Sequence, residues 1–308
     1  MSSSIEYIET SKVKALAQPS DLWGAWLTFH VWAVIIGAGA MFLAFPNPAS
    51  FILAVLLIGS RQHGLSILVH EAAHGILFKT RGLNEWVGKY LLAAPYGGNL
   101  QIYRKYHLKH HKYAQTENDP DLVLSQKFPL SNESLRRKFF RDITGQTFLR
   151  LRLAQFETLR RKLNGKDAVK IQGADAFESG SPWPSLIANL SMFSALSVSG
   201  VWWAYFALWV LPLATWFFVV IRLRNIAEHA MTTFDNNPLT HARTVKANVL
   251  ERVFFAPYWV NYHVEHHAYM YVPCHKFPEL HAAMQSAGWT QDMEICESYS
   301  QVLKLATT

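Results

Sequence analysis

Nine of the 14 histidines in this chain lie in four short segments, three of which have the spacing of metal-ligand motifs. HEAAHG contains H-x-x-x-H, YHLKHHKY and NYHVEHHAY each contain H-x-x-H-H, and RNIAEHA contributes one more histidine. On a helix, residues three and four positions apart share one face, so each motif can direct two or three imidazoles at one point. The nine histidines are His70, His74, His107, His110, His111, His229, His263, His266 and His267.

Nine imidazoles are more than one metal ion needs. A tetrahedral zinc site takes three or four protein ligands, whereas two metal ions of four to six ligands each would use all nine. Imidazole suits Fe(II), among other ions. For the other histidines a solvated or core position is the simpler interpretation, and these are His30, His63, His241, His275 and His281.

The first segment alone has another interpretation, because His70, Glu71 and His74 fit the H-E-x-x-H helix of zinc metalloproteases. In that helix the two histidines bind zinc and the glutamate activates a water molecule. A protease would need a third ligand, and the later uncharged segments contain no carboxylate. It would also leave both H-x-x-H-H motifs without a role. The protease is therefore a distant alternative.

The segments that must position these histidines are strongly apolar. Half of the chain is hydrophobic and only 17% is charged, below the roughly 25% that is typical of soluble domains. The uncharged stretch from Leu22 to Phe45 is long enough to cross a bilayer. The apolar stretch from Pro184 to Ile221 is too long for one span, so we expect two spans that fold back near residues 200–203.

The sequence therefore predicts an all-α integral membrane protein with four transmembrane helices in two hairpins and a cytosolic helical cap. One domain comprises residues 1–308. The spans cover approximately residues 22–45, 51–69, 184–200 and 203–221, and the cap covers residues 70–183 and 222–308. A shorter apolar run, Val87 to Pro95, cannot span a bilayer and is expected to lie at the interface or to re-enter it.

Charge predicts the orientation in the membrane. Most of the 29 Lys and Arg residues lie between Lys79 and Lys170, and the turns inside the two hairpins contain none. By the positive-inside tendency, this basic region, both termini and the histidine motifs face the cytoplasm. The N-terminus lacks the pattern of a signal peptide. The net charge of +7 suits an anionic lipid surface, and no nucleic-acid-binding motif accompanies it.

Two stretches of the cap have patterns of their own. Ser131 to Lys170 interleaves basic residues with Leu and Phe, which predicts amphipathic helices on the membrane or solvated helices in the cap. Gly173 to Pro184 predicts a loop that leads into the second hairpin. The two cysteines, Cys274 and Cys296, form no C-x-x-C pair and are expected to be packed or idle thiols.

Taken together, the motifs resemble those of the membrane fatty acid desaturase family. The resemblance rests on the three histidine boxes, on Asn225 and His229 as the Asn-x-x-x-His element, on NDPD at 118–121, and on EHHAYMYVPCHKFPEL around the last box. It runs from about Phe51 to His281. It implies a non-haem di-iron site on the cytosolic side of a four-span bundle. The nine histidines would be the iron ligands, and Asn225 would reach the metal through water.

The resemblance also implies a reaction. With O₂ and two electrons, such a site takes hydrogen from an unactivated C–H bond; loss of the neighbouring hydrogen gives an alkene, and return of oxygen gives an alcohol. Hydroxylases and carotenoid-type ketolases use similar boxes and remain alternatives, although the Asn225–His229 element and the residues around His263 favour a desaturase. The His-Pro-Gly-Gly element of a fused haem domain is absent. An external electron donor such as ferredoxin or cytochrome b5 is therefore expected.

Other residues receive roles by position. Carboxylates near the boxes are expected to accept hydrogen bonds from ligand imidazoles, or else to be solvated or to cap helices: Glu71, Asp119, Asp121, Glu228 and Glu265. The expected substrate is a fatty acyl group linked to CoA, a carrier protein or a lipid. Aromatic residues that either line its path or form a lipid-facing belt are Trp26, Phe29, Trp202, Trp203, Trp259 and Tyr262.

Overall fold

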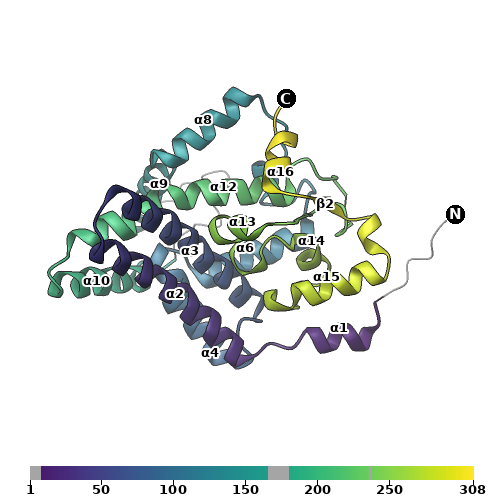
Figure 1. Cartoon of the computed structure of the whole chain (residues 1–308), viewed down its shortest axis with the longest axis horizontal. Helices are drawn as coiled ribbons and strands as arrows, with labels where there is room; N and C mark the ends of the chain where they lie inside the picture. Colours follow the sequence, from purple (N-terminus) through teal and green to yellow (C-terminus); the bar gives the residue numbers. More distant parts are fainter. Residues whose placement is uncertain (1–7, 166–179, 236) are drawn as a thin grey trace.

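A computed structural model describes residues 8–165, 180–235 and 237–308 of the chain (Figure 1). Its first hairpin joins α2 (Asp21–Ala44) to α3 (Pro48–His74), and both helices are long and apolar enough to cross a membrane. Asn47 begins α3, because its side chain accepts hydrogen bonds from the backbone N–H groups of Ala49 and Ser50 while Pro48 occupies the first turn. The helix ends at Gly75, whose φ of 75° suits glycine. The predicted first hairpin is confirmed as a pair of helices.

The second predicted hairpin is present in a different form. Its second helix consists of three consecutive helical segments: η3 (Tyr205–Val210), α11 (Leu211–Ala214) and α12 (Trp216–His229). Together they are long and apolar enough to cross a membrane. Its first helix, α10 (Trp183–Val198), is apolar but has only 16 residues. The chain turns back at Gly200, as expected. The described residues thus contain three helices of spanning length, and the span predicted at residues 184–200 corresponds to the shorter α10.

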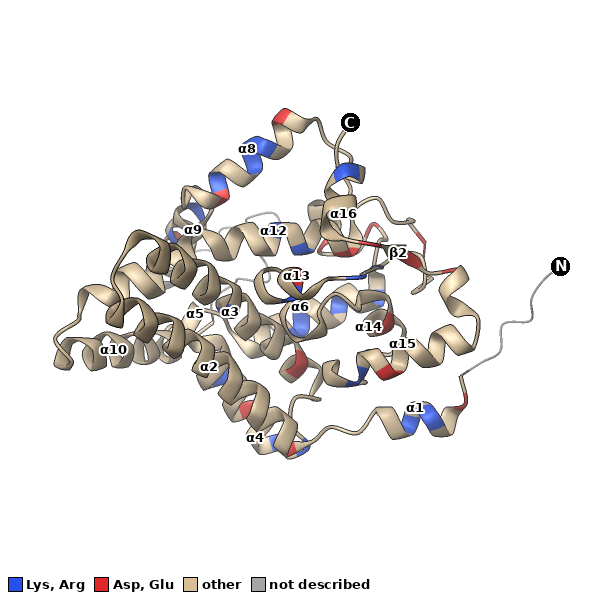
Figure 2. Ribbon diagram, in the orientation of Figure 1, with Lys and Arg blue, Asp and Glu red and all other residues tan. Residues whose placement is uncertain are grey.

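The helices α3 and α12 run beyond the predicted spans. The spans were expected to end near residues 69 and 221, but α3 continues to His74 and α12 to His229. Figure 2 shows that the helices on the left, including α10 and much of α2 and α3, carry few charged residues, whereas blue and red residues gather in the cap. The two extended helices therefore act as rigid supports that carry histidines from the apolar part into the cap.

Between the hairpins the chain forms a set of shorter helices. The run that was predicted to be too short to span forms a π-helix, η1 (Val87–Ala93), between α4 (Arg81–Trp86) and α5 (Ala94–Tyr96), and it packs against α3. Asn99 then caps α6 (Leu100–Tyr113), the helix of the second histidine box. Glycine is needed where η1 meets α3, because a Cβ at Gly88 would lie 2.7 Å from that of Ala72.

The basic stretch folds as predicted over its described part. After α7 (Leu122–Ser125) come α8 (Asn132–Ile143) and α9 (Gln146–Leu163), and both of the latter are amphipathic helices with several Lys and Arg residues. The remainder of the stretch to Lys170, and most of the loop that was predicted from Gly173 to Pro184, lie outside the described residues.

The C-terminal part wraps around the ends of α3, α6 and α12. Its helices are α13 (Val249–Phe254), η4 (Pro257–Trp259), α14 (His263–Ala268), η5 (Cys274–Lys276), α15 (Phe277–Ser286), η6 (Trp289–Gln291) and α16 (Tyr299–Leu305), with α1 (Thr10–Leu16) against α15. The predicted all-α class needs one correction, because β1 (Arg243–Val245) and β2 (Glu294–Cys296) pair in parallel. These strands could not be predicted from the sequence, because three residues are too few to show the alternation of apolar and polar residues that marks a strand. Both cysteines are free and buried.

Candidate metal centre

The nine histidines of the four segments converge on two points. One set, here called the five-histidine group, consists of His70, His74, His107, His111 and His266. The other, the four-histidine group, consists of His110, His229, His263 and His267. In each group one ring nitrogen per residue lies within 4.8 Å of those of all the other members. The structure therefore brings together every histidine that the motifs singled out.

Helix geometry explains how the H-x-x-H-H boxes are divided. On α6, His107 and His111 are four residues apart and face the five-histidine group, while His110 faces the other group. On α14, His263 and His267 face the four-histidine group, while His266 faces the five-histidine group. Adjacent residues point about 100° apart around a helix of 3.6 residues per turn. Each box therefore supplies both groups, which forces the two points to lie side by side.

The inward nitrogens are crowded together. In the five-histidine group the Nε2 atom of His111 lies 3.0 Å from that of His107 and 2.8 Å from that of His266. In the four-histidine group the Nε2 atom of His263 lies 2.8 Å from that of His229 and 3.2 Å from that of His267. One imidazole nitrogen can take part in only one such hydrogen bond. A bound cation explains the crowding better, since ligands at right angles about 2.1 Å from an ion lie about 3.0 Å apart.

Two of the outward nitrogens have hydrogen-bond acceptors, and a third lies near a carboxylate. The Nδ1 atom of His110 lies 2.8 Å from Oδ1 of Asp119, and that of His229 lies 2.9 Å from the carbonyl oxygen of His241. The Nδ1 atom of His70 lies 3.3 Å from Oε1 of Glu71. An acceptor at Nδ1 fixes the proton there and leaves the Nε2 lone pair free to bind a metal. The donor set fits a pair of divalent cations.

Burial keeps most of these imidazoles neutral. It lowers the pKa of His107, His266 and His267 well below the ordinary value, and the neighbouring histidines lower it further. For His110, burial lowers the pKa, but the carboxylates of Asp119 and Asp121 outweigh it, so the pKa is raised. Neutral imidazole is the form that binds metals.

The loop after α6 holds the two aspartates. Asp119 is buried, and besides His110 it accepts hydrogen bonds from the backbone N–H groups of Gln115 (2.9 Å) and Asp121 (2.8 Å). Asp121 accepts a hydrogen bond from the hydroxyl group of Tyr106, and its Oδ2 atom lies 3.6 Å from Nδ1 of His110. Burial raises the pKa of the Asp121 carboxyl. Both aspartates thus lie on the outer side of His110, where imidazole acceptors were expected.

The three glutamates are placed in three different ways. Glu71 contacts Nδ1 of His70 and accepts a hydrogen bond of 2.8 Å from the backbone N–H of Cys274. Glu228 pairs with Arg224, and its Oε2 atom lies 3.6 Å from Nε2 of His263, the inward nitrogen. Glu228 therefore faces the four-histidine group directly.

Glu265 lies apart from both groups of ring nitrogens. It accepts hydrogen bonds from the Thr244 hydroxyl (2.5 Å) and from the imidazole of His281. Its imidazole partner is therefore a histidine outside both groups.

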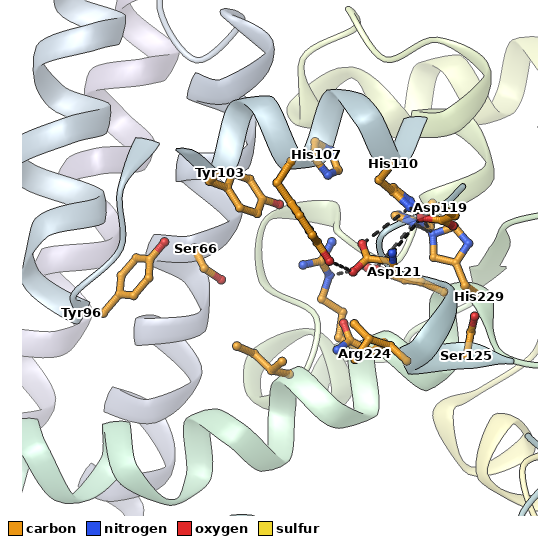
Figure 3. A pocket seen from close by; sticks show the side chains of 16 residues that line it. Ser66, Tyr96, Tyr103, His107, His110, Asp119, Asp121, Ser125, Arg224 and His229 are labelled. Atoms are coloured by element: carbon orange, nitrogen blue, oxygen red, sulfur yellow. Dashed lines mark hydrogen bonds and ion pairs between the residues drawn. The ribbon is translucent and has the colours of Figure 1, made fainter. Parts of the chain in front are cut away.

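A cavity of about 90 Å³ lies beside the four-histidine group (Figure 3). Tyr96, Ser66 and Tyr103 lie at one end of the view, and His110, Asp119 and His229 lie at the other. Asn225 also lines this cavity, one helical turn before His229. Most of the residues that line the cavity are polar, and they include Arg224 and Glu228.

The aromatic residues proposed for substrate binding are dispersed. Tyr262 lines a narrow gap of about 10 Å³ behind His263 and His266. Trp259 and Trp26 line a separate surface pocket. The others are exposed over a third or more of their surface, as a lipid-facing belt would be; they are Phe29, Trp202 and Trp203.

Sequence reasoning missed four residues that support the site. His241 accepts from His229 through its carbonyl oxygen, and its Nε2 lies 3.3 Å from Nδ1 of His267. Gln115 donates to the carbonyl oxygen of His229 and to Thr232. Arg224 and His281 pair with the carboxylates of α12 and α14. Of these four residues, only Arg224 could have been predicted from the sequence, because it is a charged residue one turn before Glu228 in an apolar segment.

Comparison with known proteins supports the same interpretation of the histidine motifs. Residues 46–293 match the family described as fatty acid desaturase. A dihydrorhizobitoxine desaturase of Bradyrhizobium elkanii is 28% identical over 259 residues, which cover 78% of this chain and 69% of that protein. The family match includes all nine histidines of the two groups. The chain therefore belongs to the fatty acid desaturase family.

Proposed function

We propose that this protein is an O₂-dependent desaturase that introduces a double bond into a fatty acyl chain at a non-haem di-iron centre. One iron would bind the five-histidine group. The other would bind the four-histidine group, with Asn225 completing its surroundings through water. The observation that carries the proposal is the convergence of nine inward Nε2 atoms on two adjacent points, with acceptors placed at outward Nδ1 atoms.

Iron fits this donor set better than zinc. Zinc sites in proteins are usually tetrahedral, whereas five imidazoles surround the first point. Imidazole nitrogen suits Fe(II), and the family match favours an oxidoreductase. When bound, the irons would supply the redox chemistry. One O₂, two electrons and two protons, with two hydrogens taken from adjacent carbons, yield one alkene and two waters.

The protein's own residues hold and protect the centre. Asp119 keeps the Nδ1 proton of His110 in place, so the Nε2 atom of His110 stays aimed inward, and Glu71 lies 3.3 Å from Nδ1 of His70. All members of the four-histidine group except the partly buried His267 are fully buried, which limits the access of water. No pair of groups is needed to act as general acid and base on the substrate. The electrons would come from a separate carrier such as ferredoxin or cytochrome b5.

The proposed setting is a membrane crossed several times, with the metal centre and both termini on the cytoplasmic side. Three helices of spanning length support a membrane protein. The helices α3 and α12 both end at the histidine groups, and basic residues gather around the same end.

The acyl group could be linked to CoA, to a carrier protein or to a lipid. The related protein from Bradyrhizobium is named for a different compound, dihydrorhizobitoxine. Hydroxylation would differ only in the fate of oxygen, whereas ketone formation would need a second round of oxidation, with another O₂ and two more electrons, at the same carbon.

Metal and product analysis tests the proposal. The purified protein should contain about two irons per chain. Expression in a host of known lipid composition, followed by mass spectrometry, should reveal acyl chains lighter by two hydrogens. Chains that gain one oxygen instead would identify a hydroxylase. A single tightly bound zinc with no lipid product would contradict the proposal and favour a protease.

A further inference from the structure

A second pocket, of about 270 Å³, lies away from the polar cavity of Figure 3. It opens between α2, α3, α13 and the turn at Pro257–Trp259, and we call it the arginine pocket. Three basic side chains line it, Arg61, Arg252 and His30, and no Asp or Glu does. The pocket is therefore positively charged, and no acidic side chain among its lining residues neutralises that charge.

Arg61 is the deepest of these groups. Its exposed fraction is 7%, and one guanidinium N–H donates to the carbonyl oxygen of Val253 at 3.3 Å. Its Nε atom is buried and has no hydrogen-bond partner. Among the described residues, no carboxylate lies within 4.0 Å of either Arg61 or Arg252. A buried guanidinium without an acidic partner is costly unless an anion binds to it.

The floor of the arginine pocket is held in a strained shape. Tyr258 and Trp259 have φ values of 55° and 56°, a left-handed conformation that is rare for aromatic residues. The hydroxyl of Tyr258 lies 3.0 Å from Nδ1 of His30. Gly64 permits this packing, because a Cβ there would lie 2.7 Å from the Tyr258 ring. Arg61 and Arg252 lie 5.9 Å from the ring centres of Tyr258 and Trp259, respectively.

The rim of the arginine pocket is apolar. Val249 on α13 and Trp26 on α2 line the pocket and are 76% and 52% exposed, and on the same two helices Leu250 and Phe29 are 69% and 63% exposed. Apolar side chains exposed on a helix of spanning length belong in lipid. A molecule that enters from this side meets hydrocarbon first and the arginines second.

We propose that the arginine pocket binds the anionic head of a membrane amphiphile, a carboxylate or a phosphate, whose hydrocarbon tail lies along the apolar rim. The head would contact the guanidinium groups of Arg61 and Arg252, which both line the pocket. This inference goes beyond the desaturase proposal, because binding needs neither iron nor turnover.

The arginine pocket also lies close to the histidine groups. Arg61 precedes His70 by nine residues on α3, which is about 13.5 Å along the axis. Tyr258 lines both this pocket and the narrow gap that reaches His70, His263 and His266. An amphiphile held by its head at Arg61 is therefore near enough for its tail to approach the metal centre, if it is the substrate.

Fluorescence with a charged and an uncharged probe tests the inference. The full chain is purified in dodecyl maltoside and titrated with cis-parinaric acid, and energy transfer from tryptophan, including Trp26 and Trp259, reports binding. The matched probe is cis-parinaryl alcohol, which lacks the carboxylate. We expect the acid to bind about tenfold more tightly than the alcohol. Equal affinities for the two probes would overturn the inference.

Variants of the two arginines test whether their charges bind the carboxylate of the probe. Arg252→Gln changes an exposed side chain and should weaken binding of the acid about tenfold without affecting the alcohol. Arg61→Gln should do the same, and Arg61→Lys should restore part of the affinity. Arg81→Gln, on α4 outside the pocket, is the matched control and should bind like the unmodified protein. Unchanged affinity for the acid in both glutamine variants would contradict the assignment.

Competition distinguishes the two sources of the anion. If oleate displaces parinaric acid and dioleoylphosphatidylglycerol does not, the pocket takes a carboxylate. If the phospholipid displaces the probe more effectively, the pocket takes a lipid phosphate. Failure of both competitors would count against the proposal.

Discussion

His110 and His111 are adjacent in the chain, yet their imidazoles belong to different histidine groups. The Nε2 atom of His111 lies 2.8 Å from that of His266, and the Nε2 atom of His110 lies 3.2 Å from that of His229. A helix rotates by about 100° per residue, so neighbours diverge. One turn of α6 therefore contributes to both histidine groups.

Removal of one ligand from each group should have separable effects on metal content. His110→Ala and His266→Ala should each reduce iron from about two to about one per chain and abolish turnover, because one group keeps its full set. Metal analysis and lipid mass spectrometry measure both effects. His275→Ala, on a histidine that stacks on Trp23 and belongs to neither group, is the control. Normal activity in either ligand variant would refute the assignment.

Asp119 should matter through His110. Asp119→Asn weakens the acceptor at the Nδ1 proton of His110, and loss of such a partner typically costs 10–100-fold in metal affinity or activity. Iron affinity can be measured by competition with a chelator. Asp292→Asn, at an exposed position away from both histidine groups, should leave the affinity unchanged. An Asp119→Asn protein with unaltered iron affinity would show that the contact has no supporting role.

Glu71 distinguishes the desaturase from the protease that its motif first indicated. Because Glu71 lies between His70 and the backbone N–H of Cys274, we expect it to support His70 without touching substrate. Glu71→Ala should therefore reduce activity by about 10–100-fold and leave a measurable rate. A protease would lose its general base and all activity. Complete inactivity together with one bound zinc would favour the protease.

The metal-free protein should lose stability in mild acid. Burial lowers the pKa of His266 and His267 below the unfolded value of about 6.5. At pH above 6.5 both states are neutral and stability is unaffected, but as pH falls below 6.5 the unfolded chain gains protons that the folded chain cannot. Unfolding temperature in the presence of a chelator should therefore be lower at pH 5 than at pH 7.5. An unchanged temperature would mean that these histidines are protonated in the folded state.

The sequence was sufficient to predict which histidines come together and which helices carry most of them. Spacing of three and four residues puts side chains on one face of a helix whatever surrounds it, so HEAAHG and the two H-x-x-H-H boxes could be interpreted locally. Uncharged runs such as Leu22 to Phe45 likewise predicted helices of spanning length by composition alone. The continuation of α3 and α12 to His74 and His229 was not predicted, because those turns are polar and no longer resemble a membrane span.

Only the tertiary structure decided how the histidines are divided and what supports them. The division into five and four depends on the angles at which α3, α6, α12 and α14 meet, and no spacing within one helix encodes those angles. The partners of the carboxylates depend on the same packing: Asp119 reaches His110, whereas Glu265 lies against His281. A side chain's neighbours within a helix follow from the 3.6-residue period, but its partners across helices follow from how the whole chain packs.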